Sequence, residues 1–425
     1  MPSMPSMRSI WYWPDNAAPM QHTPSPTPLR PLLIATLLGQ IAFGLVAMTI
    51  CLPSMQEWGA IFDAGQPAVQ LSFSAYVLMF GLLQLLYGPL SDRYGRKVVL
   101  MTGLAVACAG SAMAALAPNL DALIAARAIQ GAGSAAGMVV GRSMVQDLFQ
   151  GPHRTRMMAY IGMVMGLCPP LAMVIGGQLH VRLGWQANFV LMAALALLLL
   201  VTGWRVLPAH RAVAMDPRSH WLGDMGAAYA RLAREPVFLL YVVILAMTTG
   251  AFYAFLAGAP LVLGTYGVGP DGVGWYIMVV PLSYIVGNFL TSRMVRRQGD
   301  HRMMAAGQVS SLVGIALMLA LSQTGLTSPL VFVLPLTLLG LGHGFLMPPS
   351  LAGSVGVLAG LAGAAAGVAG VMQQLTGAVA SYMVGLLPNK GSAALGLLMM
   401  AMTLCAFGAQ WLLRSRDRSH NRHAA

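Results

Sequence analysis

The chain has 425 residues, of which 57% are hydrophobic and only 8% are charged. Soluble domains carry about 25% charged residues, so this chain has too few to cover a surface that faces water. The net charge of +12 is high, but the basic residues lie between apolar segments and form no single stripe, which excludes a nucleic-acid-binding protein. In lipid, long apolar segments must be helical, because each backbone group has to find its partner within its own segment. The composition therefore predicts an all-α membrane protein.

The N-terminal stretch 1–30 is rich in proline and polar residues and has no apolar core that ends in a small-residue cleavage site. We expect a disordered cytoplasmic tail there rather than a signal peptide. Apolar runs then follow one another along the chain, each near the length of about 20 residues that crosses a bilayer. The runs cover 31–52, 69–89, 98–117, 121–141, 157–179, 188–207, 237–259, 273–292, 303–322, 330–350, 362–385 and 392–413.

Most links between the runs are short, but the stretch 208–236 is long and charged. We predict that it is a cytoplasmic linker between an N-terminal half, 31–207, and a C-terminal half, 237–413, followed by a second cytoplasmic tail, 414–425. Two similar halves of six spans are a common plan for transporters, in which the substrate site lies near the bilayer midplane between the halves.

The lysines and arginines are distributed asymmetrically around these runs. All but three of the 24 lie in the two tails, or in the links and helix ends on the same side as the tails. The opposite side has only Arg182 and Lys390, and Arg127 lies inside the fourth run. Because positive residues favour the cytoplasmic side, we predict that both termini are cytoplasmic.

The strongest local signal is the segment Gly88–Lys97 between the second and third runs. Its glycines permit a tight reversal, and Asp92 can pair with an arginine or a helix N-terminus in a contact that forms and breaks as helices rock. An ordinary basic loop is the alternative. A weaker echo lies at the matching place of the second half, from Asn288 to Arg302. The residues that we expect to form a conformational switch are Gly88, Asp92, Arg93, Gly95, Arg96, Lys97, Arg142 and Asp147.

The segment Gly88–Lys97 resembles the loop signature of the major facilitator superfamily. Residues 69–72 and 84–87, the fourth run, and Trp185 with Phe189 are similar to the drug:proton antiporter branch that includes chloramphenicol and bicyclomycin exporters. The likeness covers the first half, and the second half agrees mainly in its span pattern. The resemblance implies the major facilitator fold, with two six-helix halves around a central cavity, in a protein that works as a monomer in a bacterial inner membrane.

Arg127 lies inside the fourth run, which Asp121 opens. A guanidinium buried in a bilayer is costly and normally faces a cavity or a partner. The resemblance implies that this arginine is linked to proton coupling and to substrate in the central cavity, and we place Gln130, on the same run, with it. The alternative is a structural arginine bonded to neighbouring carbonyls.

The fifth run contains Pro169, Pro170, Gly176 and Gly177. Small residues at such spacing let helices approach closely, and proline bends a helix. The set resembles the antiporter signature of exporters, although Met173 stands where the family usually has its second proline. We expect a hinge here, and simple close packing is the alternative.

Members of the branch commonly place an aspartate shortly before a Leu-Pro pair in the first span. Here the pair is Leu52-Pro53, and Thr49 stands where the acid is expected. Of the 12 acidic residues, all lie in loops, tails or loop edges except Asp121, which opens the fourth run near the outer surface. A cation in a low-dielectric cavity needs a counter-charge. We therefore expect a cavity that prefers neutral or anionic molecules.

Proton coupling then lacks its usual carboxylate. His343, the one histidine inside an apolar run, titrates in a suitable range, with Asp121 or the substrate itself as the other candidates. A hydrogen-bonded packing histidine is the alternative. Tyr253 on the seventh run and Tyr284 on the eighth are expected to line a drug-sized pocket, and other aromatic and polar residues of the second half are candidates to join them. These are Tyr241, Thr248, Thr249, Phe252, Tyr276, Asn288, Gln373 and Gln374.

No HExxH, Walker loop, GxSxG elbow or cluster of metal ligands occurs, so we expect no enzyme, metal or cofactor. The sequence predicts a secondary-active exporter of a neutral or anionic amphiphile, such as an amphenicol-like drug or a siderophore, that uses protons and alternating access. The partners are a small-molecule substrate, protons and membrane lipid. A metabolite importer or facilitator of the same fold is the alternative, and a multi-span membrane enzyme that acts on lipid is a remote one.

Overall fold

The computed structural model describes residues 31–208, 221–326, 328–358, 360–388 and 391–423. The described residues form helices and no strand, which confirms an all-α protein. The predicted tail 1–30 lies outside the described residues, as do residues 209–220 of the predicted linker.

The helices before the linker are α1 (Pro31–Thr49), α2 (Met55–Ile61), α3 (Gln66–Tyr94), α4 (Arg96–Ala115), α5 (Leu120–Leu148), α6 (Gly151–Leu183) and α7 (Gln186–Val206). The linker contains α8 (Trp221–Ala233). The helices after it are α9 (Pro236–Thr265), α10 (Pro270–Ile277), α11 (Val279–Gln298), α12 (Asp300–Ser322), α13 (Pro329–Gly356), α14 (Ala362–Gly385) and α15 (Ser392–His423).

Among the described residues, 11 helices are long and apolar enough to cross a membrane, with α10 and α11 counted together. Each of the predicted apolar runs corresponds to a helix at that place. The eleventh predicted span, α14, has 24 residues but is not among the 11, because its glycines and the adjacent Gln373 and Gln374 make it less apolar. The chain is therefore a multi-pass membrane protein in which one helix of spanning length carries polar side chains.

Several helix boundaries differ from those that the apolar runs predict. α3 continues through Gly88 and Pro89 to Tyr94, so most of the predicted loop Gly88–Lys97 is helical. The chain reverses at Gly95 alone, whose φ of +93° favours glycine because it has no Cβ. Gly299, with φ +77°, connects α11 to α12 in the same way in the second half. This match supports an internal repeat.

The C-terminal tail is also more regular than predicted. α15 continues from the last apolar run to His423, so residues 414–423 are helical. Arg414 anchors this extension because its Nη2 donates to the carbonyl oxygen of His301 at the start of α12. The short helices α2 and α8 were not predicted, because apolar periodicity marks only elements that cross the bilayer.

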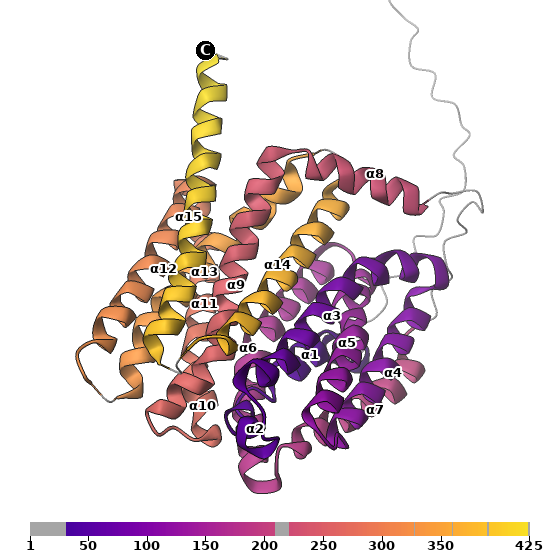
Figure 1. The fold of residues 1–425 in the computed structure, drawn as a ribbon. Helices are drawn as coiled ribbons and strands as arrows, with labels where there is room; N and C mark the ends of the chain where they lie inside the picture. Colours follow the sequence, from indigo (N-terminus) through magenta and orange to yellow (C-terminus); the bar gives the residue numbers. More distant parts are fainter. Residues whose placement is uncertain (1–30, 209–220, 327, 359, 389–390, 424–425) are drawn as a thin grey trace, which may run out of the picture.

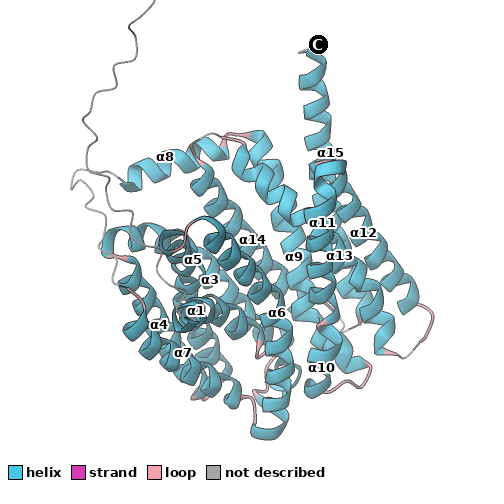
Figure 2. Ribbon diagram, turned by 180° about the vertical axis from the view of Figure 1, so that it is seen from behind, coloured by secondary structure: helices cyan, strands magenta, loops and turns pink. Residues whose placement is uncertain are grey.

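The helices pack into two groups that lie side by side (Figure 1). Helices α1–α7 contact one another and form the N bundle, and α9–α15 form the C bundle. The bundles meet mainly where α3 packs on α14 and where α6 packs on α10 and α11. We call the end with Gly95, α8 and the C-terminal part of α15 the linker end, and the end with α2 and α10 the far end. Figure 2 shows α8 and the end of α15 on the same side of the molecule.

Candidate functional site

A cavity of about 270 Å³ lies between the two bundles. This volume is close to the lower limit of about 300 Å³ that is typical of small-molecule sites. The N bundle contributes Leu45, Phe80, Gln84, Met138, Arg142 and Met165. The C bundle contributes Thr249, Phe252, Tyr253, Tyr284, His343, Met347, Gly370, Gln373 and Gln374.

The wall from the C bundle presents amides, hydroxyls and rings that are already linked to one another. Tyr253 Oη donates to Gln374 Oε1 at 3.0 Å, and Thr249 Oγ1 donates to Gln373 Oε1 at 3.1 Å. These bonds fix two glutamines of α14 against α9. Phe252 packs edge-on against the ring of His343, with ring centroids 5.9 Å apart. The wall is therefore an ordered surface of uncharged polar groups and aromatic rings.

The wall from the N bundle contains Arg142, which is the only arginine, lysine or carboxylate residue among the described lining residues. Arg142 Nη2 contacts the Sδ atom of Met165 at 2.7 Å, and the residue takes part in no ion pair within the described part of the chain. Phe80, Met138 and Met165 line the same cavity and give it apolar and adaptable surface. No carboxylate of the described residues lines the cavity, so a bound cation would have no counter-charge there.

On the far-end side of this cavity the two bundles are joined by side-chain amides. Gln70 Nε2 on α3 donates to the carbonyl oxygen of Ala257 on α9 at 3.1 Å. Gln56 Nε2 on α2 donates to the carbonyl oxygens of Pro260 and Val268, the latter at 3.3 Å. Each acceptor lies closer to the far end than the cavity residues of α9 do. The cavity therefore lies on the linker side of these contacts.

Arg127 is fully buried within the N bundle and does not line the cavity. Its Nη1 donates to the carbonyl oxygen of Ala47 at 2.7 Å and to Gln130 Oε1 at 2.5 Å, and its Nη2 donates to the carbonyl oxygen of Met48 at 3.3 Å. The ring of Tyr76 lies 4.2 Å from its Cζ atom. This geometry matches the structural alternative, in which α5 is tied to the end of α1, rather than the predicted substrate contact.

Two other predicted coupling residues also lie away from the cavity. Thr49 is fully buried, and its hydroxyl donates to the carbonyl oxygen of Leu45 at 2.9 Å and to that of Pro169 at 3.4 Å. Asp121 is exposed in the first turn of α5. Neither position is suited to contact a molecule in the cavity, whereas Tyr253, Tyr284 and His343 all line it. Of the other candidates of the second half, Thr249, Phe252, Gln373 and Gln374 line the cavity too.

His343 is not the one histidine inside a spanning helix, as the apolar runs had indicated. α6 continues to Leu183 and so includes His180, which is buried in its last turn. His180 Nε2 lies 2.9 Å from Glu57 Oε2 on α2. This contact belongs to the far end of the N bundle, where Trp58 packs against Trp185. The prediction failed because the fifth apolar run ended at residue 179, four residues before the end of α6, and so left out His180.

The predicted hinge on α6 consists of residues with different surroundings. α6 remains helical through Pro169 and Pro170. A Cβ atom on Gly176 would lie 1.8 Å from the carbonyl oxygen of Ile50, in the same bundle. A Cβ atom on Gly177 would lie 2.1 Å from the carbonyl oxygen of Pro270, in the other bundle. The two glycines therefore permit close contacts in opposite directions.

The predicted switch residues gather at the linker end of the N bundle, with two exceptions. Arg96 Nη1 pairs with Asp92 Oδ1 at 3.1 Å, and Arg96 Nε pairs with Asp147 Oδ2, which joins α3, α4 and α5. Lys97 Nζ donates to the carbonyl oxygens at the end of α7, and Arg93 stacks over the ring of Tyr94. Gly88 lies inside α3 rather than in a turn, and Arg142 belongs to the cavity.

Sequence reasoning missed Arg142 and Gln84 as cavity residues. Met138 and Arg142 are four residues apart on α5, and Phe80 and Gln84 are four apart on α3, so each pair shares one helix face. A search for apolar and polar residues at this spacing near the ends of spans is the signal that would have found them.

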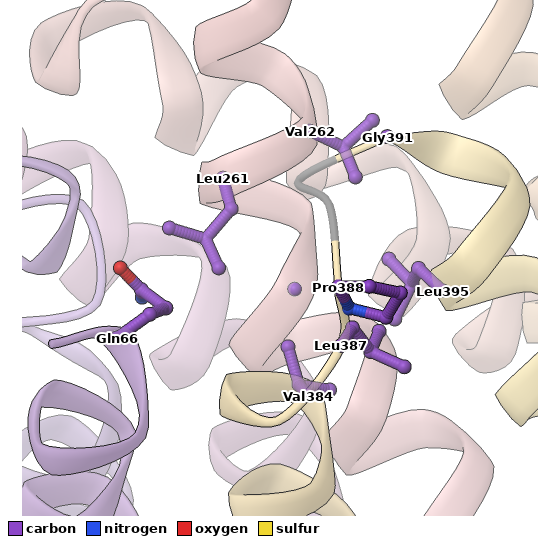
Figure 3. Close-up of a pocket in the computed structure, with 9 residues that line it drawn as sticks. Gln66, Leu261, Val262, Val384, Leu387, Pro388, Gly391 and Leu395 are labelled. Carbon is purple, nitrogen blue, oxygen red and sulfur yellow. The ribbon is translucent and has the colours of Figure 1, made fainter.

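A second, smaller pocket of about 190 Å³ lies near the far end. Figure 3 shows apolar side chains of α9, α14 and α15 around it, including Leu261 and Val384, with Gln66 of α3 at its side. Gln66 is the only polar side chain among the described residues that line it. Nor do the described residues contain a group of three or more potential metal ligands. The larger cavity is therefore the candidate site.

Comparison with known proteins identifies relatives along most of the chain. Multidrug resistance protein D of Escherichia coli is 28% identical over 401 residues, which cover 92% of this chain and 96% of the relative. A chloramphenicol resistance protein of Pseudomonas aeruginosa is 26% identical and covers 73% of this chain and 74% of the relative. These matches confirm the predicted resemblance to the drug:proton antiporter branch.

Solved structures share the fold at low sequence identity. The nucleoside transporter NupG aligns with a TM-score of 0.74 at 12% identity, over 91% of this chain and 99% of its own. A bacterial homolog of the human lysosomal transporter Spinster, in an inward-facing and unoccupied conformation, aligns with a TM-score of 0.73 at 15% identity, over 93% of this chain and 98% of its own. The profile of the Major Facilitator Superfamily matches residues 32–381. With this match and two bundles of helices around a shared cavity, the chain belongs to the major facilitator superfamily of membrane transporters.

Proposed function

We propose that the protein is a proton-coupled exporter of neutral or anionic amphiphilic small molecules in a bacterial inner membrane, and that it works as a monomer. The observation that carries this proposal is the cavity between the bundles, which combines apolar side chains and amides with Arg142 and contains no carboxylate among its described lining residues. The printed names of the relatives, which include multidrug and chloramphenicol resistance proteins, support export of drugs.

Alternating access follows from the contacts between the bundles. The distribution of lysines and arginines favours both termini, and hence the linker end, on the cytoplasmic side. The amide contacts of Gln56 and Gln70 then close the outer side, and the cavity is reached from the cytoplasm. Export requires that these contacts break and that the bundles rock toward each other at the linker end.

His343 is the group that we propose to carry the coupling proton. It lines the cavity, unlike Asp121, and its imidazole ring can take up and release a proton. Arg142 faces the same cavity, so protonation of His343 places a second positive charge beside it. A neutral substrate that hydrogen-bonds to the unprotonated imidazole would compete with the proton for the cavity, as antiport requires.

The proposal is tested by the accumulation of labelled chloramphenicol in efflux-deficient cells that make this protein, with and without a protonophore. Lower accumulation that the protonophore restores supports proton-driven export. Cells that carry the empty vector are the control, and the amount of protein in the membrane is measured in parallel. Unchanged accumulation with the protein present in the membrane counts against export of this drug.

Import or facilitated diffusion of a metabolite is the second candidate function. Met173, which is fully buried in α6, stands where exporters of this branch usually have a proline. This departure from the exporter pattern favours import or facilitated diffusion. Right-side-out and inverted vesicles with an imposed pH gradient distinguish the two directions. An exporter accumulates substrate in inverted vesicles when their lumen is acidic, whereas an importer that is driven by protons accumulates it in right-side-out vesicles when the outside is acidic.

A further inference from the structure

We propose that Arg142 is the anion-recognition residue of the cavity, so that the protein accepts apolar molecules with a single carboxylate through Arg142 and uncharged molecules without it. This inference rests on the proposed function and specifies the substrate class of the same site. The sequence had led us to expect the substrate contact at Arg127 and to place Arg142 in the conformational switch.

The two arginines of α5 differ in what their guanidinium groups contact. Arg127 is fully buried, and its donors are used by the carbonyl oxygens of Ala47 and Met48 and by Gln130. Arg142 is half-buried at the cavity wall, and its hydrogen-bond partner there is the thioether of Met165, which is a weak acceptor. A guanidinium has five N–H donors, so Arg142 retains most of its hydrogen-bonding capacity for a ligand.

The chain provides no described carboxylate that neutralises Arg142. Asp147, five residues further along α5, is held by Arg96, and Asp92 binds the same arginine. A positive charge in a membrane-embedded cavity is costly without a partner. A carboxylate supplies that partner and matches the planar donor pattern of a guanidinium with two parallel hydrogen bonds.

The remaining walls define the rest of the ligand. Phe80, Met138 and Met165 line the cavity together with Arg142 and offer contact to an apolar or aromatic body. On the C bundle, the amide and hydroxyl groups of Gln373, Gln374, Tyr253 and Thr249 are uncharged, and they bind polar groups of either hydrogen-bonding type. A second anionic group on the ligand would find no arginine or lysine on that wall among its described residues. The chemistry therefore fits an amphiphilic monocarboxylate.

Binding to the purified protein in lipid nanodiscs tests this assignment with three labelled probes. These are nalidixate, which is an aromatic monocarboxylate, its uncharged ethyl ester, and chloramphenicol. The variants are Arg142→Gln, Arg142→Lys and, as a matched control, Arg156→Gln, because Arg156 is exposed at the start of α6 and does not line the cavity.

We expect Arg142→Gln to weaken nalidixate binding by about tenfold or more, the loss typical of a hydrogen bond to a charged group. The affinities for the ester and for chloramphenicol should stay within about twofold, since a neutral ligand makes no charge-assisted bond. Arg142→Lys should retain part of the nalidixate affinity, and Arg156→Gln should bind all three probes as the unchanged protein does.

Two results would overturn the assignment: equal binding of nalidixate to the Arg142→Gln variant and the unchanged protein, or binding of neutral probes alone by the unchanged protein. Failure of the proposed function is distinct from both. In that case nalidixate binding depends on Arg142, yet cells that make the protein export none of the probes.

Discussion

The Nε2 atom of Gln70 on α3 donates a hydrogen bond to the carbonyl oxygen of Ala257 on α9, 3.1 Å away, and joins the two bundles on the far side of the cavity. Gln70 is fully buried, so this bond is shielded from water. It has to break whenever the far end opens. The closed far end is therefore stabilised by a specific amide rather than by apolar packing alone.

Replacing Gln70 with leucine should shift the protein toward the conformation that is open at the far end. Leucine has a similar volume but no donor, and a hydrogen bond contributes about 0.5–1.5 kcal/mol, so we expect a shift of several-fold in the population ratio. Double electron–electron resonance between spin labels at Ala60 and Thr265, both exposed at the far end of different bundles, measures the opening. The labels are placed in a variant without the four native cysteines. An unchanged distance distribution would contradict the prediction.

Gly177 and Gly176 provide a matched pair of substitutions on α6. A Cβ at Gly177 meets Pro270 of the other bundle, and this clash is relieved when the bundles separate. A Cβ at Gly176 meets Ile50 of the same bundle, and no rocking motion relieves it. Gly177→Ala should lengthen the distance between labels at Ala60 and Thr265, whereas Gly176→Ala should lower the melting temperature and leave that distance unchanged. If both variants changed the label distance and the melting temperature alike, the contact of Gly177 would not be one that opening of the far end relieves.

Replacing Arg127 and replacing Arg142 should have different effects on thermal stability. Arg127→Gln leaves the carbonyl groups of Ala47 and Met48 without their donor, at a cost of about 1–3 kcal/mol for each unsatisfied buried group. Arg142→Gln removes only a contact to a sulfur atom. Thermal unfolding in detergent should show a melting temperature that falls by several degrees for Arg127→Gln and stays nearly constant for Arg142→Gln. A larger fall in melting temperature for Arg142→Gln than for Arg127→Gln would contradict the structural role that we assign to Arg127.

His343→Gln should separate substrate movement from the proton gradient. Glutamine keeps a hydrogen-bonding side chain beside Phe252 but cannot take up a proton in the physiological range. In proteoliposomes, we expect chloramphenicol exchange at equal pH to continue, while accumulation driven by a pH gradient is lost. Tyr284→Phe, which changes another cavity residue without removing a titrating imidazole, is the control. Gradient-driven accumulation that persists in His343→Gln would assign the proton to another group.

The fold was predictable from the sequence because hydropathy and helix length depend on local composition. The residues that face the cavity were less so. Tyr253, Tyr284 and His343 line it, but Arg127 does not, because its carbonyl partners Ala47 and Met48 lie about 80 residues earlier in the chain. The face that a helix turns toward the cavity is determined by its packing against such distant elements. A single sequence contains no record of that packing.

The ends of the helices were also hard to predict from the sequence, because they depend on neighbouring helices as well as on residue type. Pro89 lies within α3 although proline usually ends a soluble helix, because neighbouring helices in a membrane can satisfy the freed backbone group. Of the two glycines in the predicted segment, Gly95 alone turns the chain, with a positive φ that favours glycine. Residue type alone did not distinguish the glycine that turns the chain from the one inside the helix.

The composition of α14 has a consequence for how the protein is made. This helix is not apolar enough to cross the membrane by composition alone, since the side-chain oxygens of Gln373 and Gln374 would meet hydrocarbon without a donor, at a cost of several kcal/mol. In the finished protein, Tyr253 and Thr249 of α9 bond both glutamines. Because α9 is synthesised before α14, its hydroxyl groups are already in the bilayer when α14 leaves the ribosome. The order of biosynthesis thus provides α14 with a template, and a fragment that begins after α9 should fail to insert it through the translocon.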